Sequence, residues 1–162
     1  MFAIRRQAIL VGLIVLLDQV TKSWAVSALA DGRVIHVFGS LQFSLGFNSG
    51  FAFSQGQGMG PLVGIFAIIA VLFLLRAVRK ATTQLSAMAL CAIVAGALGN
   101  IADRIFRGEG WLHGRVVDFI DVQWWPVFNV ADSSITVGAC ALIAAMLMES
   151  RNGKVVDKTD ES

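Results

Sequence analysis

Four apolar segments, each long enough to cross a membrane, constrain the fold of this chain more than any other feature. They run over about 7–28, 61–79, 84–105 and 128–148, and a helix needs about 20 residues to cross the hydrocarbon core of a bilayer. Only 15% of the residues are charged, against about a quarter in a soluble domain. The pattern predicts an all-α integral membrane protein, a bundle of four transmembrane helices. The third segment is rich in Ala and Gly, which predicts that it lies at the centre.

The first connecting loop, over 30–60, has a pattern of its own. Apolar residues alternate along it, which is typical of a strand or hairpin with one apolar face. A flexible Gly-rich connection is expected after it, over 55–60. The polar stretch 151–162 predicts a disordered tail, so residues 1–150 form the one folded domain. The alternating residues are Leu41, Phe43, Leu45 and Phe47.

Basic residues fall unevenly on the two sides of the predicted bundle. The N-terminus, the loop between the second and third spans and the tail share eight Lys and Arg residues, while the other two loops, together with Arg104 at the end of the third span, hold four. By the positive-inside rule, both termini are expected in the cytoplasm, with the 30–60 and 106–127 loops facing outwards. The net charge of +2 is too small to indicate nucleic-acid binding.

Polar side chains interrupt the ends of these spans. A charged side chain at the bilayer centre costs at least about 2.5 kcal/mol, so such residues usually face the bundle interior and are functional. The predicted topology brings them to one level near the outer leaflet. Residues three or four apart share a helix face, so each short motif directs an amide and a carboxylate to the interior together. The residues are Asp18, Asn100, Asp103, Arg104, Asn129 and Asp132, with Asp118 just before the fourth span.

Two of these carboxylates also have a structural interpretation. Asp18 lies one helical turn before Lys22, so the two can form an ion pair within the first span. That pair also favours an uncleaved first helix, although the segment imitates a signal peptide. Asp103 can form an anchoring pair with the adjacent Arg104 at the membrane interface. Structural and functional roles are equally open for both carboxylates.

Asp118 and Asp132 have no obvious basic partner in the sequence, which favours a functional role. Two aspartates in a low-dielectric site cannot both ionise easily, so the pair holds one proton between them. The ionised member can take a proton from water while the neutral member polarises a carbonyl, as in aspartic proteases. Amides such as Asn48 or Asn129 could orient the water, although Asn129 could instead only cap the fourth helix.

Other function classes compete with a peptidase at this point. The sequence has no Gly-x-Ser-x-Gly motif and no zinc-protease motif. Carboxylates in a bundle also suit a proton-coupled transporter, which predicts pH-driven ion flux. A non-enzymatic scaffold predicts instead that Asp118 and Asp132 can both become Asn without loss of function.

Five short stretches resemble the bacterial lipoprotein signal peptidases, also called signal peptidase II. They occur in the family's order and on a matching four-helix topology, which makes the resemblance far more specific than any one stretch. The stretches are LDQVTK at 17–22, NSGFAFS at 48–54, GNIADR at 99–104, GRVVDF at 114–119 and FNVADS at 128–133.

The resemblance implies an aspartic endopeptidase of the bacterial cytoplasmic (inner) membrane. Such an enzyme removes the signal peptide of a prolipoprotein just before a cysteine that carries diacylglycerol. It implies Asp118 and Asp132 as the catalytic dyad, no metal or organic cofactor, and competition by the cyclic peptide globomycin. The fold that it implies includes a small extracytoplasmic β platform, formed by the first outer loop over the site. Its partners are prolipoproteins and membrane lipid, and a monomer suffices. The supporting and substrate-holding residues that it implies are Asp18, Asn48, Asn100, Asp103, Arg104 and Asn129.

The stretch 107–114 departs from the family pattern, because it is longer than the expected link between the third and fourth motifs. The motifs stay intact, but the shape of the outer rim is left open. Asp103 also lies at the level of the dyad. We prefer Asp118 as the dyad member because Arg104 lies beside Asp103 and can hold it ionised, whereas Asp118 lies among Val and Phe.

Overall fold

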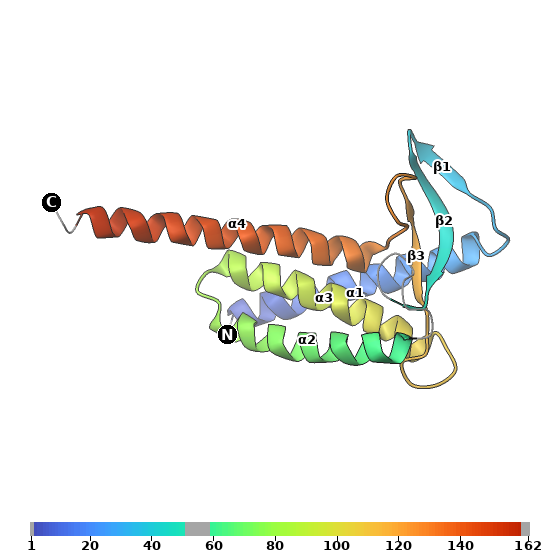
Figure 1. Cartoon of the computed structure of the whole chain (residues 1–162), viewed down its shortest axis with the longest axis horizontal. Coiled ribbons are helices and arrows are strands. Elements are labelled where there is room, and N and C mark those ends of the chain that lie inside the picture. Colours follow the sequence, from blue (N-terminus) through green and yellow to red (C-terminus); the bar gives the residue numbers. More distant parts are fainter. Residues whose placement is uncertain (1, 51–58, 160–162) are drawn as a thin grey trace.

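The predicted fold class is confirmed by a computed structural model, which describes residues 2–50 and 59–159, with side chains over 4–50 and 59–151. The described residues contain four helices long and apolar enough to cross a membrane, and one small antiparallel sheet. The start of α1 and the end of α4 lie at one end of the bundle, and the sheet lies at the other (Figure 1). The elements are α1 (Phe2–Ala28), β1 (Ile35–Phe38), β2 (Leu41–Asn48), α2 (Gly60–Lys80), α3 (Gln84–Phe106), β3 (Val116–Asp121) and α4 (Val130–Thr159).

Local chemistry explains where the middle helices begin and end. Pro61 stands in the first turn of α2, where its missing N–H has no helical partner to lose, and basic residues close the last turn. Thr83 precedes α3 and its Oγ1 accepts a hydrogen bond from the Ser86 N–H at 3.2 Å, which satisfies one of the free amides of the first turn. Both helices therefore lie within two residues of their predicted bounds.

The last helix differs from the prediction. α4 continues through Thr159, whereas the sequence predicted an end near residue 148 and a disordered tail over 151–162. Once a helix is formed, each added residue gains a hydrogen bond, and the polar run contains no proline to stop it. Residues 160–162 of the predicted tail, like 51–58 of the second motif and its flexible connection, lie outside the described residues.

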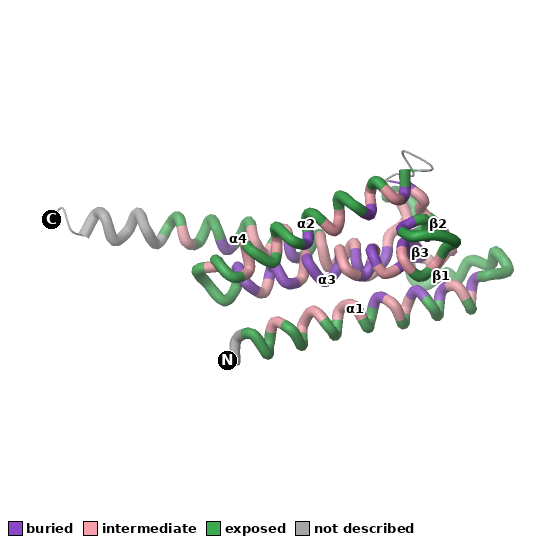
Figure 2. Tube along the Cα trace, turned by 90° about the horizontal axis from the view of Figure 1, so that it is seen from below, coloured by how far each residue is buried: buried purple, intermediate pink, exposed green. Residues whose placement is uncertain are grey.

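α3 lies at the centre of the bundle, as its small residues predicted. Figure 2 shows it between α1 on one side and α2 and α4 on the other, with buried residues concentrated along it. In its span 56% of the residues are buried, against 17% or less in the other three. Two glycines allow α4 to approach closely: a Cβ on Gly96 would collide with the Ala131 carbonyl oxygen, and one on Gly138 would lie 2.8 Å from that of Ala89.

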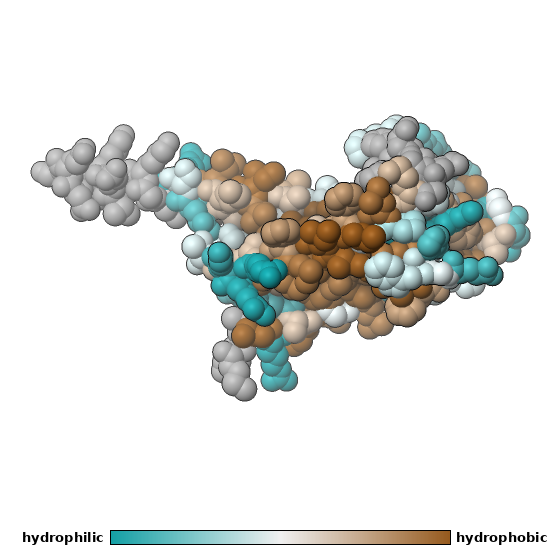
Figure 3. All heavy atoms as spheres, turned by 60° about the horizontal axis from the view of Figure 1, so that its bottom comes forward, coloured by the Kyte–Doolittle hydropathy of each residue, from teal (hydrophilic) through white to brown (hydrophobic). Residues whose placement is uncertain are grey.

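The outer surface of the bundle is apolar. Hydrophobic side chains cover its middle and hydrophilic ones gather towards its two ends (Figure 3). Large exposed residues such as Leu13, Phe66, Phe73 and Ile143 contribute to this surface. Contiguous apolar area of this extent is typical of a membrane-facing surface.

The sheet has the predicted hairpin and a third strand that the sequence analysis did not assign. β1 and β2 form the hairpin, and β3 pairs with β2 in antiparallel register, with Gly46 opposite Asp118. The sequence analysis placed Asp118 just before the fourth span and assigned it no secondary structure. It lies instead on a strand rich in β-branched and aromatic residues, which favour a pleated, buried surface. Phe119 of β3 packs with Trp24 of α1, their ring centroids 6.2 Å apart, and fixes the sheet to the bundle.

Candidate active site

Asp18 and Lys22 form a fully buried ion pair on α1, at the predicted one-turn spacing. Lys22 Nζ lies 2.9 Å from Asp18 Oδ2, and both side chains are 0% exposed. The other oxygen, Oδ1, accepts the N–H of Ala131 at 2.9 Å, one of the first-turn amides of α4 that have no partner within the helix. Gly99 makes room for this carboxylate, since a Cβ there would lie 2.6 Å from Asp18 Oδ2.

The Lys22 ammonium also joins α1 to α3. Besides Asp18, its Nζ contacts Asp103 Oδ2 at 2.9 Å and donates to Asn100 Oδ1 at 2.9 Å. An ammonium has three N–H donors, and here three acceptors surround it. A buried charge is tolerated only with such complete pairing, so this cluster requires α1 and α3 to keep one relative position.

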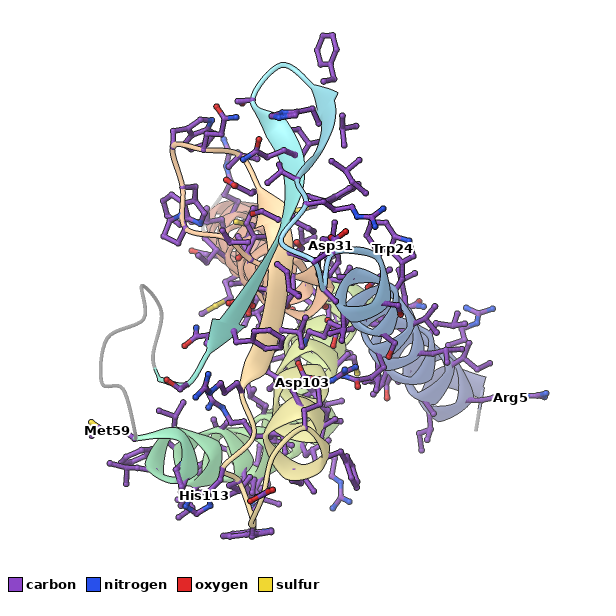
Figure 4. The ribbon with its side chains drawn as sticks, turned by 90° about the vertical axis from the view of Figure 1, so that its right-hand side faces the viewer. Arg5, Trp24, Asp31, Met59, Asp103 and His113 are labelled. Atoms are coloured by element: carbon purple, nitrogen blue, oxygen red, sulfur yellow. The ribbon has the colours of Figure 1, made fainter. Side chains whose placement is uncertain are left out.

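Asp103 is held by donors from three elements, and not by its neighbour Arg104. Figure 4 shows Asp103 in the middle of the molecule, where α1, α3 and β3 meet. Its carboxylate oxygens contact Lys22 Nζ (2.9 Å), Gln19 Nε2 (3.0 Å), Arg107 Nε (2.9 Å) and the Val117 N–H (3.1 Å). The ion pair suggested between Asp103 and Arg104 is therefore wrong: the cations that pair with Asp103 are Lys22 and Arg107. A carboxylate with so many donors holds elements together and leaves little capacity for substrate.

Asn129 joins the two aspartates that the sequence analysis paired. Its Nδ2 donates to Asp118 Oδ1 at 2.7 Å, and its Oδ1 accepts the Asp132 N–H at 2.8 Å. The backbone N–H of Asn129 donates to Asp132 Oδ2 at 3.3 Å, and Asn100 Nδ2 donates to Asp132 Oδ1 at 2.8 Å. The reciprocal bonds between Asn129 and Asp132 form a capping box at the start of α4. The predicted capping role and the predicted site role therefore coincide in one side chain.

Burial raises the pKa of Asp118 to about 7. Removal from water is the largest cause and the negative charge of Asp132 the second, while hydrogen bonds from Asn129 and Asn48 act in the opposite direction. Because Asp118 lies on β3 between two buried apolar residues, the desolvation that the sequence analysis expected is present. A carboxyl with this pKa exchanges its proton near neutral pH, as a general acid or base should.

Arg104 lines the same cavity as Asp118 and Asp132. Its Nη2 donates to the Gly50 carbonyl oxygen at 2.8 Å. Its Nη1 has no hydrogen-bond partner among the described residues, although Arg104 is only 5% exposed. An unpaired buried donor is costly, so this atom needs an acceptor from beyond the described residues. Asn48 shapes this region, since its Oδ1 accepts the Gly50 N–H at 2.9 Å.

A cavity of about 430 Å³ connects these groups. α2 contributes Val63 and Ala67 to its wall, and an apolar groove of about 490 Å³ adjoins it along α4. Five of the eight predicted site residues line the cavity: Asn48, Asn100, Arg104, Asp118 and Asp132. The other three, Asp18, Asp103 and Asn129, are buried behind it.

Three participants were not singled out as site residues in the sequence. Lys22 was expected only as the partner of Asp18, while Gln19 and Arg107 were not considered. Arg107 stands four residues after Asp103, which is the spacing of an ion pair on one helix face. That spacing was a signal in the sequence for Arg107 as a partner of Asp103. Gln19 shares its stretch with Lys22, but nothing local indicates that it reaches α3.

Known proteins share both the sequence pattern and the fold. The family model of signal peptidase (SPase) II matches residues 10–148. The lipoprotein signal peptidase of Rhodococcus jostii is 39% identical over 141 residues, 86% of this chain and 71% of that protein. That of Bifidobacterium longum subsp. infantis is 35% identical over 150 residues, 91% and 82% of the two chains. A bacterial membrane enzyme solved by the in meso method at 2.3 Å has a TM-score of 0.78 and 31% identity, over 92% of both chains.

Proposed function

This chain belongs to the signal peptidase II family, and we propose that it is an aspartic endopeptidase that removes signal peptides from prolipoproteins. The proposed substrate carries diacylglycerol on a cysteine, and the bond cut is the one before that cysteine. The observation that carries the proposal is the bridge that Asn129 makes between Asp118 and Asp132 beside a cavity. It brings together the two carboxylates that this chemistry needs.

The proposed reaction is the direct attack of water on the scissile carbonyl. Asp132, whose two oxygens accept hydrogen bonds from Asn100 and Asn129, acts as the ionised base and takes a proton from water. Asp118, whose pKa is raised to about 7, acts as the acid and donates to the carbonyl oxygen. The water oxygen bonds to the carbonyl carbon to give a tetrahedral intermediate. When its C–N bond breaks, the amine takes the proton that Asp132 removed from water, and the hydroxyl that becomes the new carbonyl returns a proton to Asp118.

The remaining cavity groups hold the substrate and the dyad. The Nη1 of Arg104, which has no hydrogen-bond partner among the described residues, is the proposed donor for a peptide or ester oxygen of the substrate. Asn48 lies on the wall of the same cavity. The buried Lys22 cluster keeps α1 and α3 in register, which fixes Asn100 and through it Asp132. The proposed reaction uses water and these side chains, without a metal or organic cofactor.

We further propose that the protein lies in the bacterial cytoplasmic membrane with its site near the outer leaflet. The basic residues favour cytoplasmic termini. The start of α1 and the end of α4 share one end of the bundle, and the sheet lies at the other (Figure 1). The site belongs to the sheet end, because Asp118 lies on β3 and Asp132 in the first turn of α4. A lipidated substrate in the outer leaflet could then reach the cavity from the bilayer.

The test is cleavage of a diacylglyceryl-modified prolipoprotein by the reconstituted protein, followed by gel shift. Wild type should cleave, globomycin should compete, and Asp118→Asn and Asp132→Asn should fold but be inert. Asp103→Asn should keep some activity. Asp121→Asn is the matched control, because that carboxylate also lies on β3 but accepts from Gln42 and Ser44 of the sheet.

Two results would overturn the proposal. If Asp103→Asn is inert while Asp118→Asn cleaves, the dyad is misassigned. If wild type leaves the substrate whole while a known lipoprotein signal peptidase cuts it in parallel, the peptidase function is wrong, and pH-driven ion flux in proteoliposomes becomes the next measurement.

A further inference from the structure

The stretch 107–114, longer than the family pattern predicts, folds into a compact loop at the sheet end of α3. The Gly114 N–H donates to the Arg104 carbonyl oxygen at 2.9 Å, and the His113 N–H donates to that of Gly110 at 3.3 Å. The ends of the loop touch, since a Cβ on Gly108 would lie 2.6 Å from the Gly114 Cα. Figure 4 shows His113 of this loop beside α2. The loop is therefore held by contacts of its own and is a defined part of the rim.

Leu112 is the buried residue at the centre of this loop. Its side chain is 0% exposed, although the residues on either side of it are exposed. Its φ of 61° lies in the left-handed region, which is strained for a residue with a branched side chain. Strain of this kind persists only where the surroundings impose it. Here the burial of the leucine side chain against α2 imposes it.

Gly64 of α2 provides the notch into which Leu112 fits. A Cβ on Gly64 would lie 2.9 Å from Leu112 Cδ2 and 3.1 Å from Cδ1. A larger residue at this position would therefore push the leucine out. Because Gly64 and Leu112 come from elements far apart in the sequence, this contact fastens the loop to the first turns of α2.

The same contact reaches the candidate site through Gly60. A Cβ on Gly60 would lie 3.4 Å from the Leu112 carbonyl oxygen and 3.4 Å from Arg104 Nη1. The first turn of α2 is therefore packed between the loop and the guanidinium. One turn later, Val63 forms part of the cavity wall. A shift of this end of α2 would change both the wall and the packing around Arg104 Nη1.

We propose that Leu112 is a positioning residue for substrate binding. It locks the start of α2 against α3, and the packed Gly60 backbone in turn holds the Arg104 guanidinium in place at the cavity wall. The inference rests on the proposed function, because the ligand of Arg104 is the lipidated peptide substrate. It also gives the longer loop a role that the shared motifs do not require.

The test measures KM and kcat for the diacylglyceryl-modified prolipoprotein. Leu112→Ala should raise KM by about three- to tenfold, a part of the loss expected when a hydrogen bond to a charged group is removed, and should change kcat by less than about twofold. Gly64→Ala, which displaces the leucine, should raise KM similarly. The double variant should recover most of the wild-type KM, because the new methyl group fills the vacated space. Glu109→Ala, exposed in the same loop, should behave as wild type.

A second cycle tests the route through Arg104. In an Arg104→Lys background, Leu112→Ala should leave KM unchanged, because the proposed hydrogen bond between the Arg104 guanidinium and the substrate is already lost. If wild type cleaves and Leu112→Ala lowers thermal stability but keeps the wild-type KM, the leucine is only structural and the inference fails while the peptidase function stands. Additive effects of Gly64→Ala and Leu112→Ala would also overturn it. Failure of wild type to cleave would instead remove the proposed function, and the inference with it.

Discussion

Replacement of Lys22 by Met should lower the free energy of unfolding by about 3–5 kcal/mol, the usual loss when one partner of a buried ion pair is removed. Its Nζ lies 2.9 Å from both Asp18 and Asp103, with none of the three side chains exposed. Methionine preserves most of the volume, so the loss measures charge and hydrogen bonding more than packing. Asp103 keeps Arg107 as a cation, whereas Asp18 has no other ion pair among the described residues.

Arg107→Met is the matched control. Arg107 Nε lies 2.9 Å from the same Asp103 carboxylate, but its side chain is 24% exposed. Water can therefore replace part of what it provides, and exposed pairs contribute about 1 kcal/mol or less. The two variants remove one positive charge each from the same cluster and differ mainly in burial.

The assay is equilibrium unfolding by denaturant in detergent micelles, with helix content as the signal. Asp18→Asn in the Lys22→Met background should restore part of the loss, because it removes the unpaired buried charge. Equal losses for Lys22→Met and Arg107→Met would refute the reasoning, as would the absence of rescue by Asp18→Asn.

Two further perturbations test the candidate site. kcat/KM should fall as pH rises through about 7, because Asp118 must keep its proton to act as the acid. A pH series should show this fall in wild type and equally in Asp121→Asn. A flat pH profile would contradict the assignment of Asp118 as the acid. Folding stability should also decrease between about pH 4 and 7, since the folded state then binds the proton that the unfolded state has released, and Asp118→Asn should remove that slope. The second perturbation is Gly99→Ala, which should lower the free energy of unfolding by about 1–3 kcal/mol through overpacking. The Cβ that it adds would lie 2.6 Å from Asp18 Oδ2. Gly12→Ala, with nothing within 4 Å of the added atom, should not destabilise in the same unfolding assay.

Features that depend on nearby residues could be predicted from the sequence. The spans follow from runs of apolar residues, and the Asp18–Lys22 pair follows from one-turn spacing on a helix. The hairpin over β1 and β2 follows from the alternation of apolar side chains. The proximity of Asn100 and Asp132 follows from topology alone, because the end of the third span and the start of the fourth lie at the same level in an antiparallel pair. The catalytic roles assigned to the aspartates stay predictions.

Features that depend on packing between distant segments were decided only by the tertiary structure. β3 exists because β2 offers a pairing edge to residues far along the chain. Arg104 donates to the Gly50 carbonyl oxygen, while Lys22 and Arg107 form the ion pairs with Asp103. Leu112 adopts a strained conformation because a glycine on another helix leaves a space that fits it. Periodicity and spacing record which face a residue occupies, but which atoms meet across that face depends on the shape and charge of the partner segment.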